Sequence, residues 1–88
     1  MKKFVYSIYD KVGQVYHNPW IDISDATAAR AFKFACADSN SLYGMCPSDF
    51  ILFRVGSFDD VSGVFSPDCV IPEKVCDGFS VEVIDHEQ

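Results

Sequence analysis

The strongest apolar pattern in the chain is the run at 50–55, which is apolar except for Arg54 and which Pro47 precedes and Gly56 follows. A short apolar run with β-branched and aromatic residues, bounded in this way, is typical of a buried strand. Residues 59–63 are rich in Asp, Ser and Gly, which favour turns, and apolar residues return directly after them. The pattern therefore predicts a hairpin over residues 50–65.

A second hairpin is predicted near the start of the chain. Residues 4–9 form a strand in which Phe4, Tyr6 and Ile8 share one face, because side chains alternate between the faces of a sheet. Residues 10–13 favour a turn, and residues 14–17 then return as the second strand of the hairpin.

Between the hairpins lies the best helical segment, residues 26–37, which is rich in alanine and lacks Gly and Pro. Ser24 is a good N-cap for this helix. The helical period places four residues on one inner face, namely Ala28, Ala31, Phe32 and Ala35. Arg30 and Lys33 fall on the opposite side, so the helix is expected to lie with its alanine-rich face on the sheet.

The remaining segments are less regular. Residues 41–48 are predicted to be a loop, and residues 79–83 alternate in a way that favours a late edge strand. The predicted fold class is α+β, an antiparallel sheet of two hairpins in the order ββαββ, with a possible fifth edge strand and one helix on one face. We expect residues 1–66 to form the compact part and residues 67–88 an acidic extension of the same domain.

Composition adds to this picture. The chain has 88 residues, enough for one domain, and 49% of them are apolar, with eight Phe. So many Phe residues in a small core favour a partner or a homodimer. The net charge is −6 and uneven: residues 1–34 carry five cations and three anions, and residues 35–88 two cations and ten anions. Overall acidity disfavours phosphate binding but leaves room for a local basic patch.

Candidate chemistry is sparse. Cys36, Cys46, Cys69 and Cys76 include no Cys-x-x-Cys pair, which favours free thiols over a zinc site. Asp59 and Asp60 are expected to serve the turn, and His17 is expected to face solvent at a strand end. No apolar run approaches the about 20 residues of a membrane helix, and no signal peptide is predicted. We therefore predict no catalytic residues, no metal, no cofactor and no membrane association.

One arrangement indicates nucleic-acid binding. Aromatic side chains on the predicted strands, Phe53 among them, lie among cations, and such surfaces can stack the bases of a single strand. The alternative is that the rings only pack in the core and at sheet edges. The candidate binding residues are Lys2, Lys3, Tyr6, Tyr9, Lys11, Tyr16, Arg30, Lys33 and Arg54.

Three sequence blocks, in order, resemble a known family. They are Ser-Ile-Tyr-Asp at 7–10, Arg-Ala-Phe at 30–32, and a block at 47–63 that begins Pro-Ser-Asp-Phe and ends Gly-Ser-Phe-Asp-Asp-Val-Ser-Gly. Over residues 3–67 the chain resembles the small nonstructural protein of microviruses, the single-stranded-DNA phages of the gokushovirus type. The resemblance implies genome handling in the cytoplasm of a bacterial host, either by binding single-stranded DNA or by turning replication towards single-strand synthesis for packaging. It brings no catalytic residues.

Two functional hypotheses follow. The first is a non-enzymatic phage accessory protein, acting as a homodimer in single-stranded DNA replication or packaging, with single-stranded DNA or a replication or packaging protein as its partner. The second is a protein-interaction module whose acidic C-terminal half engages a host or phage protein.

Overall fold

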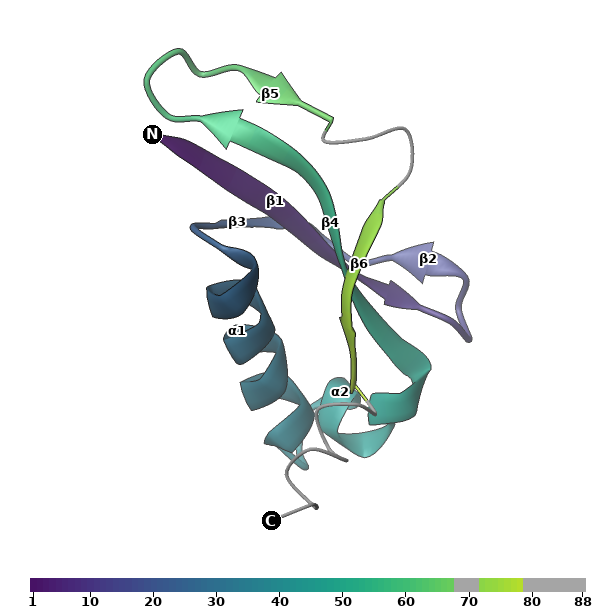
Figure 1. The fold of residues 1–88 in the computed structure, drawn as a ribbon. Helices are drawn as coiled ribbons and strands as arrows, with labels where there is room; N and C mark the ends of the chain where they lie inside the picture. The colour runs from purple at the N-terminus through teal and green to yellow at the C-terminus, as the bar shows by residue number, and fades with distance from the viewer. Residues whose placement is uncertain (68–71, 79–88) are drawn as a thin grey trace.

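One antiparallel sheet and one long helix make up most of the fold (Figure 1). The computed structural model describes residues 1–67 and 72–78. The elements, in chain order, are β1 (Lys2–Asp10), β2 (Val15–Tyr16), β3 (Trp20–Asp22), α1 (Asp25–Ala37), α2 (Leu42–Met45), the 3-10 turn η1 (Pro47–Asp49), β4 (Phe50–Asp59), β5 (Phe65–Ser66) and β6 (Glu73–Asp77). The predicted α+β class and both predicted hairpins, β1–β2 and β4–β5, are confirmed.

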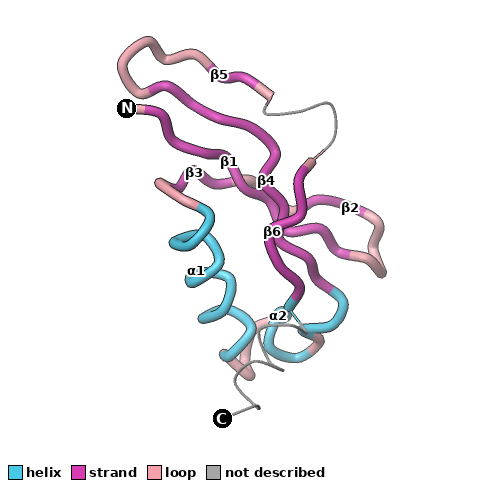
Figure 2. Tube along the Cα trace, viewed as in Figure 1, coloured by secondary structure: helices cyan, strands magenta, loops and turns pink. Residues whose placement is uncertain are grey.

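The two long strands, β1 and β4, form the centre of the sheet (Figure 2). They pair antiparallel from Lys2 opposite Asp59 to Asp10 opposite Phe50, and this pairing joins the two hairpins into one sheet. The short strands β2 and β3 both pair with β1, and β5 and β6 both pair with β4. Each central strand therefore has two short partners along its outer edge.

A bulge in β4 changes which side chains share a face. Val5 pairs with Gly56 and Tyr6 pairs with Arg54, so Val55 is the extra residue on β4. Before the bulge, Phe53 faces away from α1, and the extra residue places Phe58 on that same face. We call the side of the sheet opposite α1 the open face.

The core lies between the sheet and α1. Tyr6 and Ile8 from β1 and Phe50 and Leu52 from β4 are buried there, each no more than 6% exposed. The helix contributes Ala28 and Phe32, its two buried residues. Figure 1 shows α1 lying along one side of the sheet. Ala28 allows the helix to approach the sheet closely, and Phe32 is the largest fully buried side chain of the helix.

The N-terminus of α1 forms as predicted. The Ser24 Oγ accepts from the Thr27 N–H at 3.2 Å, and the Thr27 Oγ1 accepts from the Ser24 N–H at 3.2 Å, which completes a capping box. One prediction for this helix was wrong: Ala31 is exposed. The sheet contacts the side of the helix that carries Ala29 and Cys36, so Ala31 lies beyond the edge of the buried stripe.

The segment predicted as a loop at 41–48 instead contains α2 and the start of η1. The Ser41 Oγ donates to the Ala35 carbonyl at 2.6 Å and accepts from the Gly44 N–H at 3.0 Å, which ties α2 to the end of α1. A Cβ at Gly44 would lie 1.9 Å from the Asp38 carbonyl oxygen. Only glycine allows this close approach, and the short helix is too brief to show a helical period in the sequence.

The strand β6 was not predicted. Its pairing with β4 shifts by one residue between Leu52 and Phe53, so Val75 is an extra residue and the alternation of β6 is broken. The predicted edge strand at 79–83 lies outside the described residues. No helix among the described residues is long and apolar enough to cross a membrane.

Candidate functional site

Three aromatic rings from three strands meet on the open face. The ring centroids of Tyr9 and Tyr16 are 4.7 Å apart, and Phe53 lies 6.3 Å from Tyr9 and 5.7 Å from Tyr16. Tyr16 is 42% exposed. We call Tyr9, Tyr16 and Phe53 the ring cluster. Exposed or half-exposed rings on a sheet are the surface on which unpaired bases stack.

A second pair of rings lies further along the same face. Phe58 and Phe65 face one another across β4 and β5, with ring centroids 4.9 Å apart. Phe65 is 64% exposed. The bulge at Val55 is what brings Phe58 to the same face as Phe53. The open face therefore carries aromatic side chains near both ends of β4.

Tyr6, a candidate binding residue, is not part of this surface. Its side chain is fully buried in the core, and its hydroxyl donates to Asp25 Oδ1 at 2.6 Å. Burial of the ring, followed by the hydrogen bond to Asp25, raises the pKa of Tyr6. Side chains alternate along β1, so Tyr6 faces α1 and Tyr9 faces the open side. The assignment of Tyr6 as a stacking residue was therefore wrong.

Arg54 is also engaged inside the fold. Its Nη1 donates to both carboxylate oxygens of Asp25 at 3.2 Å, and its Nη2 bonds Glu73. The guanidinium lies 5.3 Å from the centroid of the Phe4 ring. Arg54 thus ties α1 and β6 to the central strands, and this role leaves it on the helix side, away from the ring cluster.

Three lysines lie on or next to the open face. Lys3 pairs with Phe58 and its Nζ is 3.6 Å from Asp60 Oδ2. Lys11 is exposed in the turn after β1. Lys74 pairs with Phe53, and its Nζ is 2.7 Å from Asp77 Oδ2. Sequence reasoning missed Lys74 because it did not predict β6, and no local pattern marks the residue.

The other predicted cations lie elsewhere. Arg30 and Lys33 are on the exposed side of α1, so the whole sheet separates them from the ring cluster. Lys2 is on the helix side of β1, with its Nζ 5.9 Å from the Phe4 ring centroid. The structure therefore brings together Tyr9, Tyr16, Lys3 and Lys11 on or beside the open face, and it does not bring the nine candidates into one surface.

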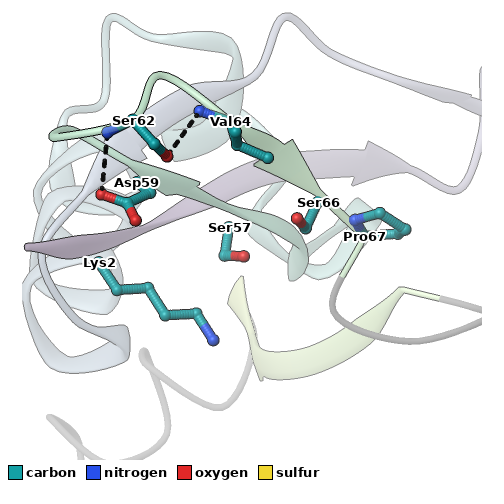
Figure 3. Close-up of a pocket in the computed structure, with 7 residues that line it drawn as sticks. All are labelled: Lys2, Ser57, Asp59, Ser62, Val64, Ser66 and Pro67. Atoms are coloured by element: carbon teal, nitrogen blue, oxygen red, sulfur yellow. Dashed lines mark hydrogen bonds between the residues drawn. The ribbon is translucent and has the colours of Figure 1, made fainter.

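Lys2 lines a polar pocket of about 460 Å³ near the tip of the β4–β5 hairpin (Figure 3). Asp59 lies in its wall and accepts from the N–H groups of Val61 at 2.9 Å and Ser62 at 3.4 Å. These backbone hydrogen bonds lower the pKa of Asp59, as expected for the predicted turn residue. With one ammonium beside one carboxylate, the pocket has no net preference for an anion.

His17 was predicted to face solvent, and this prediction was wrong. Its Nδ1 lies 2.6 Å from the Tyr43 hydroxyl, and its ring packs against Phe50 with centroids 5.8 Å apart. Its Nε2 is 3.8 Å from Asp10 Oδ2. Burial is the main cause that raises the pKa of Tyr43. The unpredicted α2 supplies Tyr43, so His17 links the first hairpin to α2.

Reactive or metal-binding groups are few in the part of the chain that the structure describes. Within residues 1–67 and 72–78, no three His, Cys, Asp or Glu side chains are grouped so that they could hold a metal ion. Cys36, Cys46 and Cys76 form no disulfide with one another, and burial raises the pKa of Cys76.

Comparison with known proteins identifies a family. No curated protein and no solved structure matches the chain significantly. A family model described as phage ORF5 protein matches residues 3–81, which include the ring cluster, α1 and all described strands from β3 to β6. The match covers most of the chain, and the protein therefore belongs to the phage ORF5 protein family.

Proposed function

We propose that this phage protein is a non-enzymatic accessory protein of single-stranded DNA replication or packaging, and that it contacts the single strand through its open face. The observation that carries the proposal is the ring cluster, with centroids 4.7 to 6.3 Å apart on one side of the sheet. The bacterial host cytoplasm is the compartment in which it would act.

Within the phage family, we propose that the chain is the small nonstructural protein of a gokushovirus-type microvirus. The support is the order of three blocks, at 7–10, 30–32 and 47–63, which resemble that protein. A microvirus genome is single-stranded, so this assignment and the proposed ligand agree with one another.

The balance of charge indicates how binding would work. A net charge of −6 opposes a polyanion, and Lys3 and Lys74 each have a carboxylate neighbour. Stacking is therefore expected to dominate, since each base stacked on an aromatic ring contributes about 1–3 kcal/mol. Each phosphate contact on a single strand steepens the salt dependence by about 0.7 in a plot of log K against log salt. With three lysines nearby, we expect a slope no steeper than about −2.

Fluorescence anisotropy with a labelled single strand tests the proposal. Tyr9→Ala and Phe53→Ala are expected to weaken binding about tenfold each, because each removes one stacking surface. Phe34→Ala is the matched control: Phe34 is 70% exposed, but it lies on α1, across the sheet from the ring cluster. Arg30→Ala is the matched control for Lys11→Ala, and only the latter is expected to flatten the salt slope.

Two results would overturn the proposal of direct contact. One is the absence of binding at low salt, where phosphate contacts are strongest. The other is equal loss of binding in Phe34→Ala and Phe53→Ala, since a strand on the open face cannot reach α1. Thermal unfolding of each variant separates loss of binding from loss of fold.

We include a homodimer in the proposal. Its support is the number of large apolar side chains that remain exposed, Val12 at 75%, Val15 at 52% and Val61 at 85% among them. Sedimentation velocity over a range of protein concentrations tests it, and a single monomeric species throughout would exclude the dimer.

The second candidate function is an acidic protein-interaction module that engages a host or phage protein. It is favoured by two exposed apolar side chains of α2, Leu42 at 54% and Met45 at 62%. A pull-down of phage and host replication proteins with the wild type and with Met45→Ser tests it. Equal recovery by both, or no recovery by either, would count against this surface.

A further inference from the structure

A hollow opens on the open face directly beside the ring cluster. Its volume is about 320 Å³, and it is lined by Ser7, Tyr16, Asn18, Pro19, Val55 and Pro72, together with His17. Tyr16 belongs both to the hollow and to the ring cluster. A strand stacked on the cluster would therefore pass over the mouth of the hollow.

Two irregularities in pairing create this space. Tyr9 pairs with Tyr16, and Tyr6 pairs with Trp20. The three residues 17–19 therefore lie opposite only two residues of β1, at positions 7 and 8. The His17 N–H still donates to the Ile8 carbonyl of β1 at 2.8 Å, and Pro19 has no N–H to donate, so the irregularity is confined to Asn18 and Pro19. Across β1, Val55 is the extra residue of the bulge in β4. Both irregularities lie beside the hollow, and together they leave the sheet surface open at this point.

The lining has a specific chemical character. The walls formed by Val55, Pro19 and Pro72 are apolar, and among the described residues, 1–67 and 72–78, no Asp, Glu, Lys or Arg lines the hollow. The hydroxyl of Ser7 donates to the His17 carbonyl at 2.6 Å, so it is engaged within the protein. Asn18 is exposed at the rim, and its amide carries both hydrogen-bond donors and an acceptor.

We propose that this hollow binds one unpaired nucleobase, stacked on Tyr16 with its edge hydrogen-bonded to Asn18. The inference rests on the proposed function and adds a site that selects and holds a single base. A phosphate or other charged group would lose its hydration there without meeting an opposite charge on the described lining residues. A nucleobase is flat, uncharged and amphipathic, and it matches apolar walls with one amide at the rim.

The route of the strand supports the same occupant. A second hollow, of about 270 Å³, is lined by Val5, Val55 and Phe65 among others. Val55 lines both hollows, so they lie next to one another, one beside Tyr16 and the other beside Phe65. A single strand that crosses both hollows would place one base against Tyr16 and a later base against Phe65.

The test is a titration of the ¹⁵N-labelled protein with each of the four deoxynucleosides, followed by amide chemical shifts. Nucleosides carry no phosphate, so the readout does not depend on strand binding. We expect shifts at Ser7, Tyr16, Asn18 and Val55 and none on α1. Asn18→Ala should weaken binding of the responding nucleoside about fivefold, the loss of about one hydrogen bond.

Val55→Trp fills the hollow and is expected to abolish the shifts, with the fold checked by the dispersion of the spectrum. Asn18→Ala, at an exposed position, keeps the test decisive if Val55→Trp does not fold. Absence of shifts with all four nucleosides at millimolar concentration overturns the inference, and so do shifts that Asn18→Ala leaves unchanged.

The proposed strand binding and the proposed base site can be refuted independently of one another. Strand binding without any nucleoside response would leave the proposed function standing and remove the base site. A nucleoside response at the hollow without strand binding would support the base site and remove the proposed function.

Discussion

The two faces of the central sheet differ far more than the sequences of their strands suggest. On the helix side, Tyr6, Leu52 and Phe50 are at most 2% exposed, and on the open face Tyr16 and Phe65 are 42% and 64% exposed. Yet both faces are built from apolar and aromatic residues. Strands with apolar residues on both faces are typical of sheets that are covered on both sides. The open face therefore has the composition of a buried surface without the helix that would bury it.

Polar groups also differ between the faces. On the helix side they form one connected network, in which Tyr6 and Arg54 both bond Asp25 and Arg54 also bonds Glu73. On the open face Lys3 contacts Asp60 and Lys74 contacts Asp77, and these two contacts lie at different positions along β4, opposite Phe58 and Phe53. One face is organised to hold the fold together, and the other keeps its rings available for contact.

The most decisive test of this difference between the faces is to remove one large ring from each of them. Phe32→Ala empties the centre of the core, where Phe32 is 1% exposed, and should cost about 3–5 kcal/mol of the free energy of unfolding. Phe53→Ala on the open face should cost about 1 kcal/mol, the usual size of a cross-strand aromatic contact. Urea denaturation of both variants measures the difference. Equal costs would mean that the open face is buried in solution.

Arg54→Ala is expected to have the next largest effect. It removes the pairing with Asp25 and Glu73, and we expect about 1–2 kcal/mol of destabilisation, since 47% and 59% exposure of those carboxylates weakens both ion pairs. Arg30→Ala, on the exposed side of α1, is the matched control and should change stability by less than about 0.5 kcal/mol. If Arg54→Ala leaves the free energy of unfolding unchanged, the network does not anchor β6.

The elements that the sequence predicted are those whose interacting residues lie close together along the chain. The hairpins and α1 were predicted because their patterns are local: alternation at 4–9, the Ser24 cap and the turn at 59–63. The pairing of β1 with β4 joins residues about 50 positions apart, and α2 and β6 are short elements stabilised by such neighbours. No local period marks elements of this kind.

The candidate site shows the same limit. Tyr9 and Tyr16 were predicted together with Phe53, because hairpin pairing relates the first two and alternation places the half-buried third on the same face. The burial of Tyr6 depends on α1 covering its side of β1. The placement of Phe58 on the open face depends on the bulge at Val55, which ordinary residues form and which the sequence does not mark.

A smaller contrast compares two tyrosines on opposite faces. Tyr6→Phe deletes the hydroxyl that donates to Asp25 at 2.6 Å inside the core, and it should cost about 1 kcal/mol. Tyr16→Phe deletes a hydroxyl from an exposed ring and should leave stability unchanged within about 0.3 kcal/mol. Thermal unfolding of the two variants measures this, and an equal loss would contradict the assignment of the faces.

The smallest expected effect depends on pH and concerns the strand that leads into α1. The Thr27 hydroxyl donates to Asp22 Oδ1 at 2.6 Å, and this hydrogen bond, with those from the Ile23 N–H and Trp20, lowers the pKa of Asp22. A carboxyl whose pKa is lower in the folded protein stabilises the fold above its unfolded pKa, and that stability is lost as the pH falls through the folded pKa. Asp22→Asn should therefore be less stable than the wild type at pH near 7, and the difference should shrink below about pH 4. Urea denaturation at both pH values measures the difference, and a deficit that stays constant with pH would show that the charge of Asp22 plays no part in holding α1 to the sheet.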